Sequence, residues 1–193
     1  MNIIVKSSNG ITLVPLETKL LTIRKIFIEG TIDSESADTV VKQFMLLADE
    51  DRKKPIDILI NSTGGEVNSG LMLYDLFQST DIPIRMICLG KAYSMAAVIF
   101  ASGKERMMLP NSRLMLHEPL IQDGIGGNTT TVKSISDSLL ETRDRLNSIL
   151  AKHTNHSVEE IEQATNFDHY FSADESIGFG LCDKIVGFAD IMR

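Results

Sequence analysis

The chain has few cysteines, no excess of basic residues and no long apolar run, and each shortage excludes a class of protein. Its two cysteines, Cys88 and Cys182, lie in apolar stretches, so we expect buried free thiols in a reducing compartment rather than a disulfide. The net charge of −7 argues against a nucleic-acid-binding surface. No apolar stretch approaches the roughly 20 residues of a membrane span, and residues 1–10 lack the apolar core of a secretory signal. The sequence therefore predicts a cytoplasmic protein without membrane or nucleic-acid partners.

The remaining composition is that of an ordinary globular protein. The 193 residues are 43% hydrophobic and 23% charged, which is enough apolar material for one sizeable core. There is no internal repeat, linker or low-complexity tract. We therefore expect a single domain over residues 1–193, with residues 1–20 as an N-terminal arm that ends in a loosely specified segment.

The order of apolar patterns predicts an α/β fold. Strands are expected at 25–30, 56–60 and 84–89, and each is followed by a helical pattern, the first capped by Ser34 or Ser36. Such repeated βαβ units pair their strands in parallel. The loops that follow the strands then lie on one side of the sheet, so the turn Gly64-Gly65 and Ser94 are expected to meet there. Shorter strands are predicted at 106–109, 113–116 and 181–186.

A helix of about residues 131–152 follows a glycine-rich stretch that contains Gly124, Gly126 and Gly127. It carries one apolar stripe, and that stripe must be buried either on a neighbouring subunit or on the chain's own domain. The stripe consists of Ile135, Leu139, Leu146, Ile149 and Leu150. Ser157 opens a capping box that begins another helix, and Gly180 closes a short helical segment that starts at Ser172.

The stretch G-K-A-Y-S-M-A-A at 90–97 is the most informative for function. Ser94 lies between a strand-like run that ends at Gly90 and a buried helical run that begins at Met95. Free backbone N–H groups at such a junction favour negative charge nearby. A hydroxyl nucleophile benefits from this setting, because the oxygen of its acyl-transfer intermediate becomes an anion.

The acyl-transfer hypothesis needs a base for Ser94, and the chain has four histidines that could serve. His117 follows a predicted strand, at the sheet edge where the Ser94 loop is expected. His153 and His156 lie at the end of the long helix, where a capping or surface role is the simpler interpretation, and their H-x-x-H spacing is a weak metal signal. His169 stands among aromatic residues and is consistent with packing alone.

Asp168 is the candidate that would orient the base, because a carboxylate among aromatic side chains needs a partner such as a histidine N–H. Its alternative is a helix N-cap, for which Ser172 and Asp174 compete. The N–H groups of Gly65 and Met95 could hold the oxyanion, whereas a plain glycine turn is the simpler interpretation. The chain has no P-loop pattern.

Four ordered motifs resemble the proteolytic subunit of the Clp ATP-dependent proteases, over about residues 26–185. They are N-S-T-G-G at 61–65, G-K-A-Y-S-M-A-A at 90–97, L-P-N-S-R-L-M-L-H-E-P at 109–119 and D-H-Y-F-S-A-D-E-S-I-G-F-G-L-C-D-K-I at 168–185. The resemblance places Ser94 on the nucleophile, His117 on the base and Asp168 on the orienting aspartate. It places Gly65 and Met95 on the oxyanion-hole amides.

The resemblance implies a crotonase-like fold with a protruding handle at about 120–150, and a serine endopeptidase that needs no metal or cofactor. It further implies a homo-oligomer of two stacked heptameric rings, a tetradecamer, into which an AAA+ Clp ATPase threads unfolded polypeptides. Some positions depart from the family pattern: Thr63 replaces a proline, Glu118 a glutamine, and Asn166-Phe167 an acidic-Arg pair. Asp57 and Leu59 stand where aromatic residues help to line the ATPase-docking pocket.

These departures leave other functions open. A divergent subunit that assembles with a paralogous subunit, as a regulatory or inactive ring component, fits the changes. A crotonase-type acyl-CoA enzyme is the third interpretation, with Glu66 as the acidic residue beside the glycine turn. We expect the Glu118 carboxylate to alter the protonation of His117 if its side chain turns inward.

Overall fold

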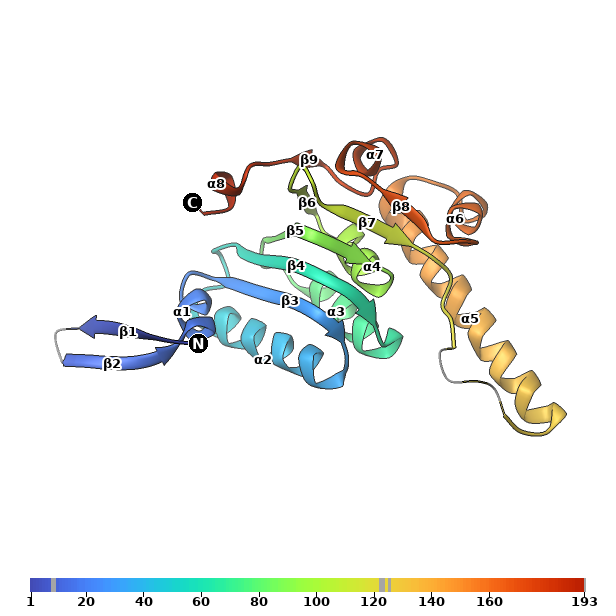
Figure 1. Ribbon diagram of the computed structural model, residues 1–193, viewed down its shortest axis with the longest axis horizontal. Coiled ribbons are helices and arrows are strands. Elements are labelled where there is room, and N and C mark those ends of the chain that lie inside the picture. Colours follow the sequence, from blue (N-terminus) through green and yellow to red (C-terminus); the bar gives the residue numbers. More distant parts are fainter. Residues whose placement is uncertain (8–9, 122–123, 125, 193) are drawn as a thin grey trace.

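The centre of the computed structural model, which describes residues 1–7, 10–121, 124 and 126–192, is a mostly parallel sheet (Figure 1). Along one path the spatial order is β3 (Lys25–Ile32), β4 (Ile56–Gly65), β5 (Ile84–Tyr93), β6 (Glu105–Met108) and β9 (Lys184–Ile185). The strand β7 (Arg113–Leu116) pairs with the end of β5, and β8 (His169–Phe171) runs antiparallel to β7. The predicted parallel pairing of the first three strands is confirmed.

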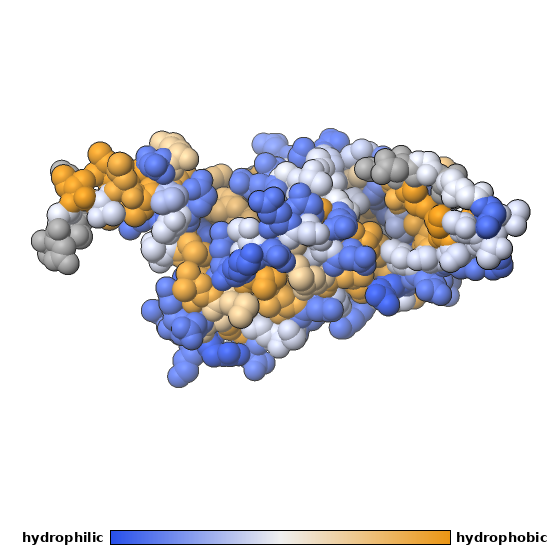
Figure 2. All heavy atoms as spheres, turned by 90° about the horizontal axis from the view of Figure 1, so that it is seen from below, coloured by the Kyte–Doolittle hydropathy of each residue, from blue (hydrophilic) through white to orange (hydrophobic). Residues whose placement is uncertain are grey.

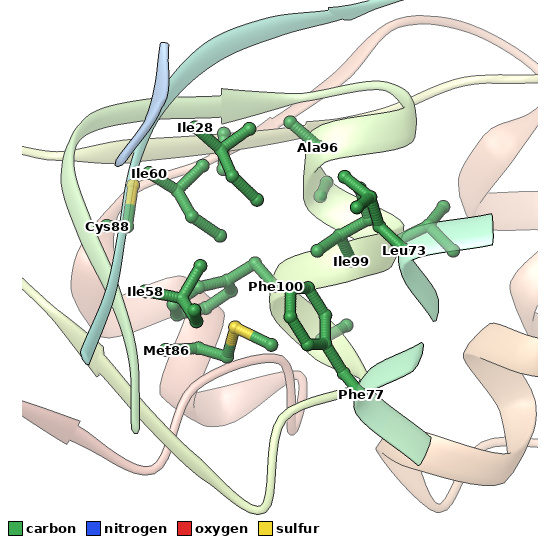
Figure 3. Packing of buried hydrophobic residues seen from close by; sticks show 14 of the residues in the cluster. Ile28, Ile58, Ile60, Leu73, Phe77, Met86, Cys88, Ala96, Ile99 and Phe100 are labelled. Atoms are coloured by element: carbon green, nitrogen blue, oxygen red, sulfur yellow. The ribbon is translucent and has the colours of Figure 1, made fainter. Parts of the chain in front are cut away.

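The helices α2 (Ser34–Glu50), α3 (Val67–Ser79) and α4 (Met95–Ala101) build the main core with one face of the sheet. Because side chains alternate along a strand, every second residue points toward these helices. Figure 3 shows Ile58, Ile60 and Met86 from the strands facing Phe77 of α3 and Phe100 of α4. This packing fixes α4, and with it the position of Ser94, against the sheet.

The opposite face of the sheet carries a smaller apolar cluster. Leu59, Ile87 and Met107 pack there with Ile191 of the last helix, α8 (Phe188–Ile191). Asp57 alternates with its neighbours onto this same face and is 3% exposed. Both Asp57 and Leu59 are therefore buried, rather than displayed to a partner.

Charge on the buried Asp57 is balanced across three strands. Its register partners are Lys25 on β3 and Arg85 on β5. The Lys25 Nζ atom lies 2.6 Å from Asp57 Oδ2, and the Arg85 Nε atom lies 2.6 Å from Asp57 Oδ1. Lys25 also donates to the carbonyl of Ile191, so this ion cluster ties α8 to the sheet.

The N-terminal arm is a hairpin followed by a short helix, which the sequence pattern did not predict. The strands β1 (Asn2–Ser7) and β2 (Gly10–Pro15) pair antiparallel and lead into α1 (Leu16–Leu21). Ser8 and Asn9, which the loosely specified segment included, lie outside the described residues. Figure 2 shows apolar surface gathered on the projecting hairpin, where Ile4, Ile11 and Leu13 are exposed.

The long helix α5 (Thr129–Thr154) projects beyond the sheet and is followed by α6 (Val158–Thr165) and α7 (Ala173–Gly178) (Figure 1). Its C-terminal half packs on its own domain, because Leu146 and Leu150 are buried in the main core. In the outer half Ile135 and Leu139 remain partly exposed. The glycine-rich stretch before α5 falls partly outside the described residues, at 122–123 and 125. Among the residues described, no helix has the length and apolarity to cross a membrane.

Several predicted boundaries were wrong for local physical reasons. Asp33, not Ser34 or Ser36, caps α2: its carboxylate accepts from the Ser36 N–H, and the Ser36 hydroxyl accepts from the Asp33 N–H. The strand β5 does not end at Gly90, because residues 91–93 pair with β7. The strand predicted at 181–186 shortens to β9, since Cys182 and Asp183 bond to neighbouring elements instead. Ser157 does cap α6 in a capping box, as predicted.

Candidate active site

Ser94 sits directly between β5 and α4 in a backbone conformation that few residues adopt. Its φ is 54° and its ψ is −126°, which costs of order 1–3 kcal/mol for a side chain other than glycine. The Ser94 N–H donates to the Met115 carbonyl at 2.8 Å, and the Ser94 carbonyl accepts from the N–H groups of Ala97 and Val98. These bonds hold a sharp strand-to-helix turn, of the kind that presents a nucleophilic hydroxyl. The sequence indicated the junction but not this strain.

His117 reaches Ser94 because β7 pairs with the last residues of β5. Tyr93 and Met115 are register partners, so the ends of the two strands lie side by side. The His117 Nε2 atom is 2.7 Å from Ser94 Oγ, a hydrogen-bond distance. The His117 side chain is 16% exposed, which limits its orientations. The pair has the spacing that a serine nucleophile and its general base require.

Asp168 approaches the opposite nitrogen of the same ring. The strand β8 runs antiparallel to β7 with Leu116 opposite His169, which sets Asp168 beside His117. The Asp168 Oδ1 atom is 3.5 Å from His117 Nδ1, which is longer than a strong hydrogen bond. The Asp168 side chain is 58% exposed. Ser172, not Asp168, is the N-cap of α7, which leaves this carboxylate free of that competing role.

The glycine turn at the end of β4 approaches Ser94 closely. A Cβ atom at Gly64 would lie 2.8 Å from the Ser94 Cβ atom and 3.0 Å from the Met95 nitrogen. Gly64 and Gly65 have φ values of 86° and 153°, which side chains other than hydrogen rarely permit. The turn thus brings Gly64, the residue before Gly65, next to Met95, whose N–H opens α4 without an intrahelical acceptor.

Ser62 holds this turn, a contact that the sequence analysis missed. Its hydroxyl donates to the Gly30 carbonyl at 2.7 Å and accepts from the Gly64 N–H at 3.0 Å. Ser62 is fully buried. A small hydroxyl residue two positions before a Gly-Gly pair is the pattern that could have indicated it. The turn therefore keeps its shape with Thr63 in the following position.

The arrangement agrees with an independent comparison of the whole sequence. The family model described as Clp protease matches residues 8–188. The chain belongs to the Clp protease family. This confirms the predicted resemblance and, with the parallel sheet and its helices, the predicted fold class.

In this Clp protease family member, a small pocket beside Ser94 is lined mainly by apolar side chains. Val98 of α4 and Leu146 and Leu150 of α5 form part of its wall, together with Pro119. Ser94, Met95 and His117 also contact it.

The other three histidines make local contacts that do not involve Ser94. His153 Nε2 lies 3.2 Å from the Tyr74 hydroxyl, and burial is the main cause that lowers the pKa of His153. His156 pairs with Glu160 and stacks on Phe179. His169 stacks on Phe171, in keeping with the packing interpretation. Within the described residues no cluster of His, Cys, Asp and Glu side chains could hold a metal.

The two cysteines and Glu66 do not offer an alternative reactive group beside Ser94. Cys88 and Cys182 are buried and free, and burial raises the pKa of Cys88 to about 12. A thiol in that state is a poor nucleophile. The Glu66 carboxylate accepts from the hydroxyls of Ser34 and Ser69 at the starts of α2 and α3. Those two hydrogen bonds give Glu66 a structural role, so its position beside the glycine turn does not require an acyl-CoA reaction.

The Glu118 carboxylate faces Arg143, and among the described residues it forms no ion pair with His117. Its Oε1 atom lies 4.0 Å from Nη1 of Arg143 on α5. The structure thus pairs the Glu118 carboxylate with Arg143.

Proposed function

We propose that the protein is a serine endopeptidase that hydrolyses unfolded polypeptides to short peptides. The 2.7 Å separation between Ser94 Oγ and His117 Nε2 carries the proposal. Asp168 beside the second ring nitrogen and membership of the Clp protease family support it. A hydroxyl, an imidazole and a carboxylate in this order form a proton path that suits acyl transfer.

In the proposed reaction the Ser94 oxygen attacks the substrate carbonyl while its proton moves to His117 Nε2. The N–H groups of Gly65 and Met95 would stabilise the oxyanion of the tetrahedral intermediate. His117 then gives the proton to the leaving amine, and water repeats the sequence to release the acyl group from Ser94. Asp168 would keep the ring nitrogen Nδ1 protonated, and the 3.5 Å separation shortens when the ring becomes charged.

We further propose that the site works inside an oligomeric chamber. Members of this family usually form rings with Clp ATPases. Two stacked heptameric rings would enclose the active sites, and an AAA+ ATPase would deliver unfolded chains. The partly apolar outer half of α5, where Val132 and Leu140 are 40% and 46% exposed, is consistent with contact to another subunit.

Labelling of the full chain with a fluorophosphonate probe tests the serine chemistry. We expect one label on Ser94, loss of the label in Ser94→Ala, and parallel loss of fluorogenic-peptide hydrolysis. Ser148→Ala is the matched control, because Ser148 is exposed on α5 and, among the described residues, its hydroxyl donates to the Asp144 carbonyl of its own helix. Labelling that persists in Ser94→Ala contradicts the proposal, and turnover of an acyl-CoA thioester would favour the crotonase-type reaction.

A regulatory subunit of a mixed ring is the second candidate. The observation that favours it is the long contact of 3.5 Å between His117 Nδ1 and the exposed Asp168, which is longer than a strong hydrogen bond. In that case the isolated chain does not label, whereas addition to rings of a paralogous subunit changes the activity of those rings. Full labelling of the isolated chain excludes this alternative.

A further inference from the structure

Arg143 is a cation of α5 that contacts acidic side chains from three parts of the chain. Its Nη1 atom lies 4.0 Å from Glu118 Oε1 and 3.6 Å from Glu162 Oε1. Its Nη2 atom lies 2.9 Å from Asp144 Oδ1. Glu118 belongs to the segment after β7, Glu162 to α6 and Asp144 to α5 itself. Such partly exposed ion pairs add little to the free energy of unfolding, so the cluster matters mainly because it holds segments of the chain in position.

The two segments that meet at Arg143 carry His117 and Asp168. Glu118 is the residue after His117, and its N–H donates to the carbonyl of Thr165, the last residue of α6, at 2.9 Å. Asp168 follows three residues later. One backbone bond and one guanidinium therefore join the end of β7 to the end of α6, on the side where the imidazole and the carboxylate face each other.

We propose that Arg143 is a positioning residue for His117, which directs the Glu118 carboxylate away from the imidazole and holds α6 against the end of β7. The inference rests on the proposed function, because it takes His117 as the base. Arg143 itself touches no reacting atom. Its effect on the reaction is transmitted through Glu118 and through the segment that ends at Asp168.

The charges around His117 determine the sign of the effect. Without the guanidinium, the Glu118 carboxylate beside His117 has no opposite charge among the ion pairs of the described residues. A free carboxylate favours the protonated imidazole, so less neutral base is present at a given pH. The titratable and charged groups nearest His117 along the chain are Glu118, after β7, and Asp168, before β8. The elements packed around them contribute further charged groups: Arg143 and Asp144 on α5, Glu162 on α6, Arg113 on β7, His169 on β8 and Glu175 on α7.

The test uses two measurements on the full chain. The first is the midpoint of the His117 ring titration, followed by NMR, and the second is the midpoint of the acidic limb of the pH profile for peptide hydrolysis. In Arg143→Gln we expect both midpoints to rise by about 0.3–0.5 pH unit, a range set by one partly screened charge. The double variant Arg143→Gln with Glu118→Gln should return both midpoints to the wild-type values. Arg145→Gln is the matched control, because Arg145 is exposed on the same helix, and it should change neither midpoint.

Two further variants separate a charge effect from a loss of structure. Arg143→Lys keeps the cation and should retain the wild-type midpoints, whereas Glu118→Gln alone should lower them. An Arg143→Gln protein with wild-type midpoints, or a double variant that fails to restore them, overturns the inference. If Arg143→Gln does not fold, Glu118→Gln becomes the test. A fall in both midpoints supports the inference, and a rise or no change overturns it.

The result is separable from the proposed function. The NMR titration is carried out in a Ser94→Ala background, where no hydrolysis occurs, and His117→Asn identifies the resonance among the four histidines. Absence of fluorophosphonate labelling in the wild-type chain would refute the serine peptidase and leave the titration shift to be measured. A normal label with no titration shift would refute only the role of Arg143.

Discussion

Replacement of Gly64 by alanine tests whether the close approach of the glycine turn to Ser94 matters for the reaction. A methyl group there would lie 2.6 Å from the Tyr93 carbonyl oxygen, where ordinary contact begins at 3.4 Å. The turn must therefore open by about 0.8 Å. The backbone at φ 86° adds roughly 1–2 kcal/mol of strain.

A displacement of this size moves the amides that would hold the oxyanion. A shift near 1 Å costs about 100-fold in rate, comparable with the loss of one oxyanion donor. We expect kcat of Gly64→Ala to fall by roughly that factor, with KM changed far less. The free energy of unfolding should decrease by about 2–3 kcal/mol, which lowers Tm by roughly 4–12 °C in a chain of this length.

The assay combines peptide hydrolysis, the rate of fluorophosphonate labelling and thermal unfolding by circular dichroism. Gly178→Ala is the matched control, because a Cβ atom at Gly178 meets nothing within 4 Å and its φ is not positive. That variant should keep full activity and gain up to about 1 kcal/mol from reduced freedom of the unfolded chain. If Gly64→Ala loses stability as expected yet hydrolyses peptide within threefold of wild type, the contact is not what orders the amides.

Three other variants probe the base, a buried charge and the dependence on pH. Asp57→Asn leaves the cations Lys25 and Arg85 uncompensated and should lower the free energy of unfolding in urea by about 2–4 kcal/mol. The exposed Asp38→Asn should lower it by at most about 0.5 kcal/mol. Equal losses of unfolding free energy in the two variants would contradict the role of the Asp57 ion cluster. Asp168→Asn should lower kcat about 100-fold without loss of fold, because His117 loses the acceptor that selects its tautomer; unchanged kcat would remove Asp168 from the mechanism. Burial lowers the pKa of His153 in the folded state, so its contribution to stability is present above pH 6.5 and is lost as the pH falls below that unfolded value. His153→Gln should therefore flatten the decline of unfolding free energy between pH 7 and 5, and an unchanged slope would contradict this assignment.

Local sequence was sufficient for the order of the central strands and helices and for the strand-to-helix junction at Ser94. Alternating apolar residues and helical stripes predicted the parallel βαβ units, because each element buries one face according to its own period. The motif around Ser94 placed a hydroxyl between a strand and a helix, and its spacing to the other motifs indicated the family. Ser157 marked the start of α6 through a capping box that involves only its near neighbours.

Contacts between distant segments were beyond a local pattern. Nothing in residues 90–93 shows that β5 continues, because the strand exists only through its pairing with β7. The burial of Asp57 depends on two basic residues that lie 32 and 28 positions away in the sequence.

The sequence by itself determined which groups are available for the proposed reaction, and the tertiary structure decided that they meet. Ser94, His117 and Asp168 belong to three segments whose separation along the chain carries no information about their distance in space. They converge because β7 pairs in parallel with β5 and antiparallel with β8. That double pairing also carries Glu118 to Arg143, a direction of the side chain that no residue near Glu118 in the sequence specifies. Strand pairing and ion pairing both join segments that are distant in the sequence. They therefore form only when the chain folds and brings those segments together.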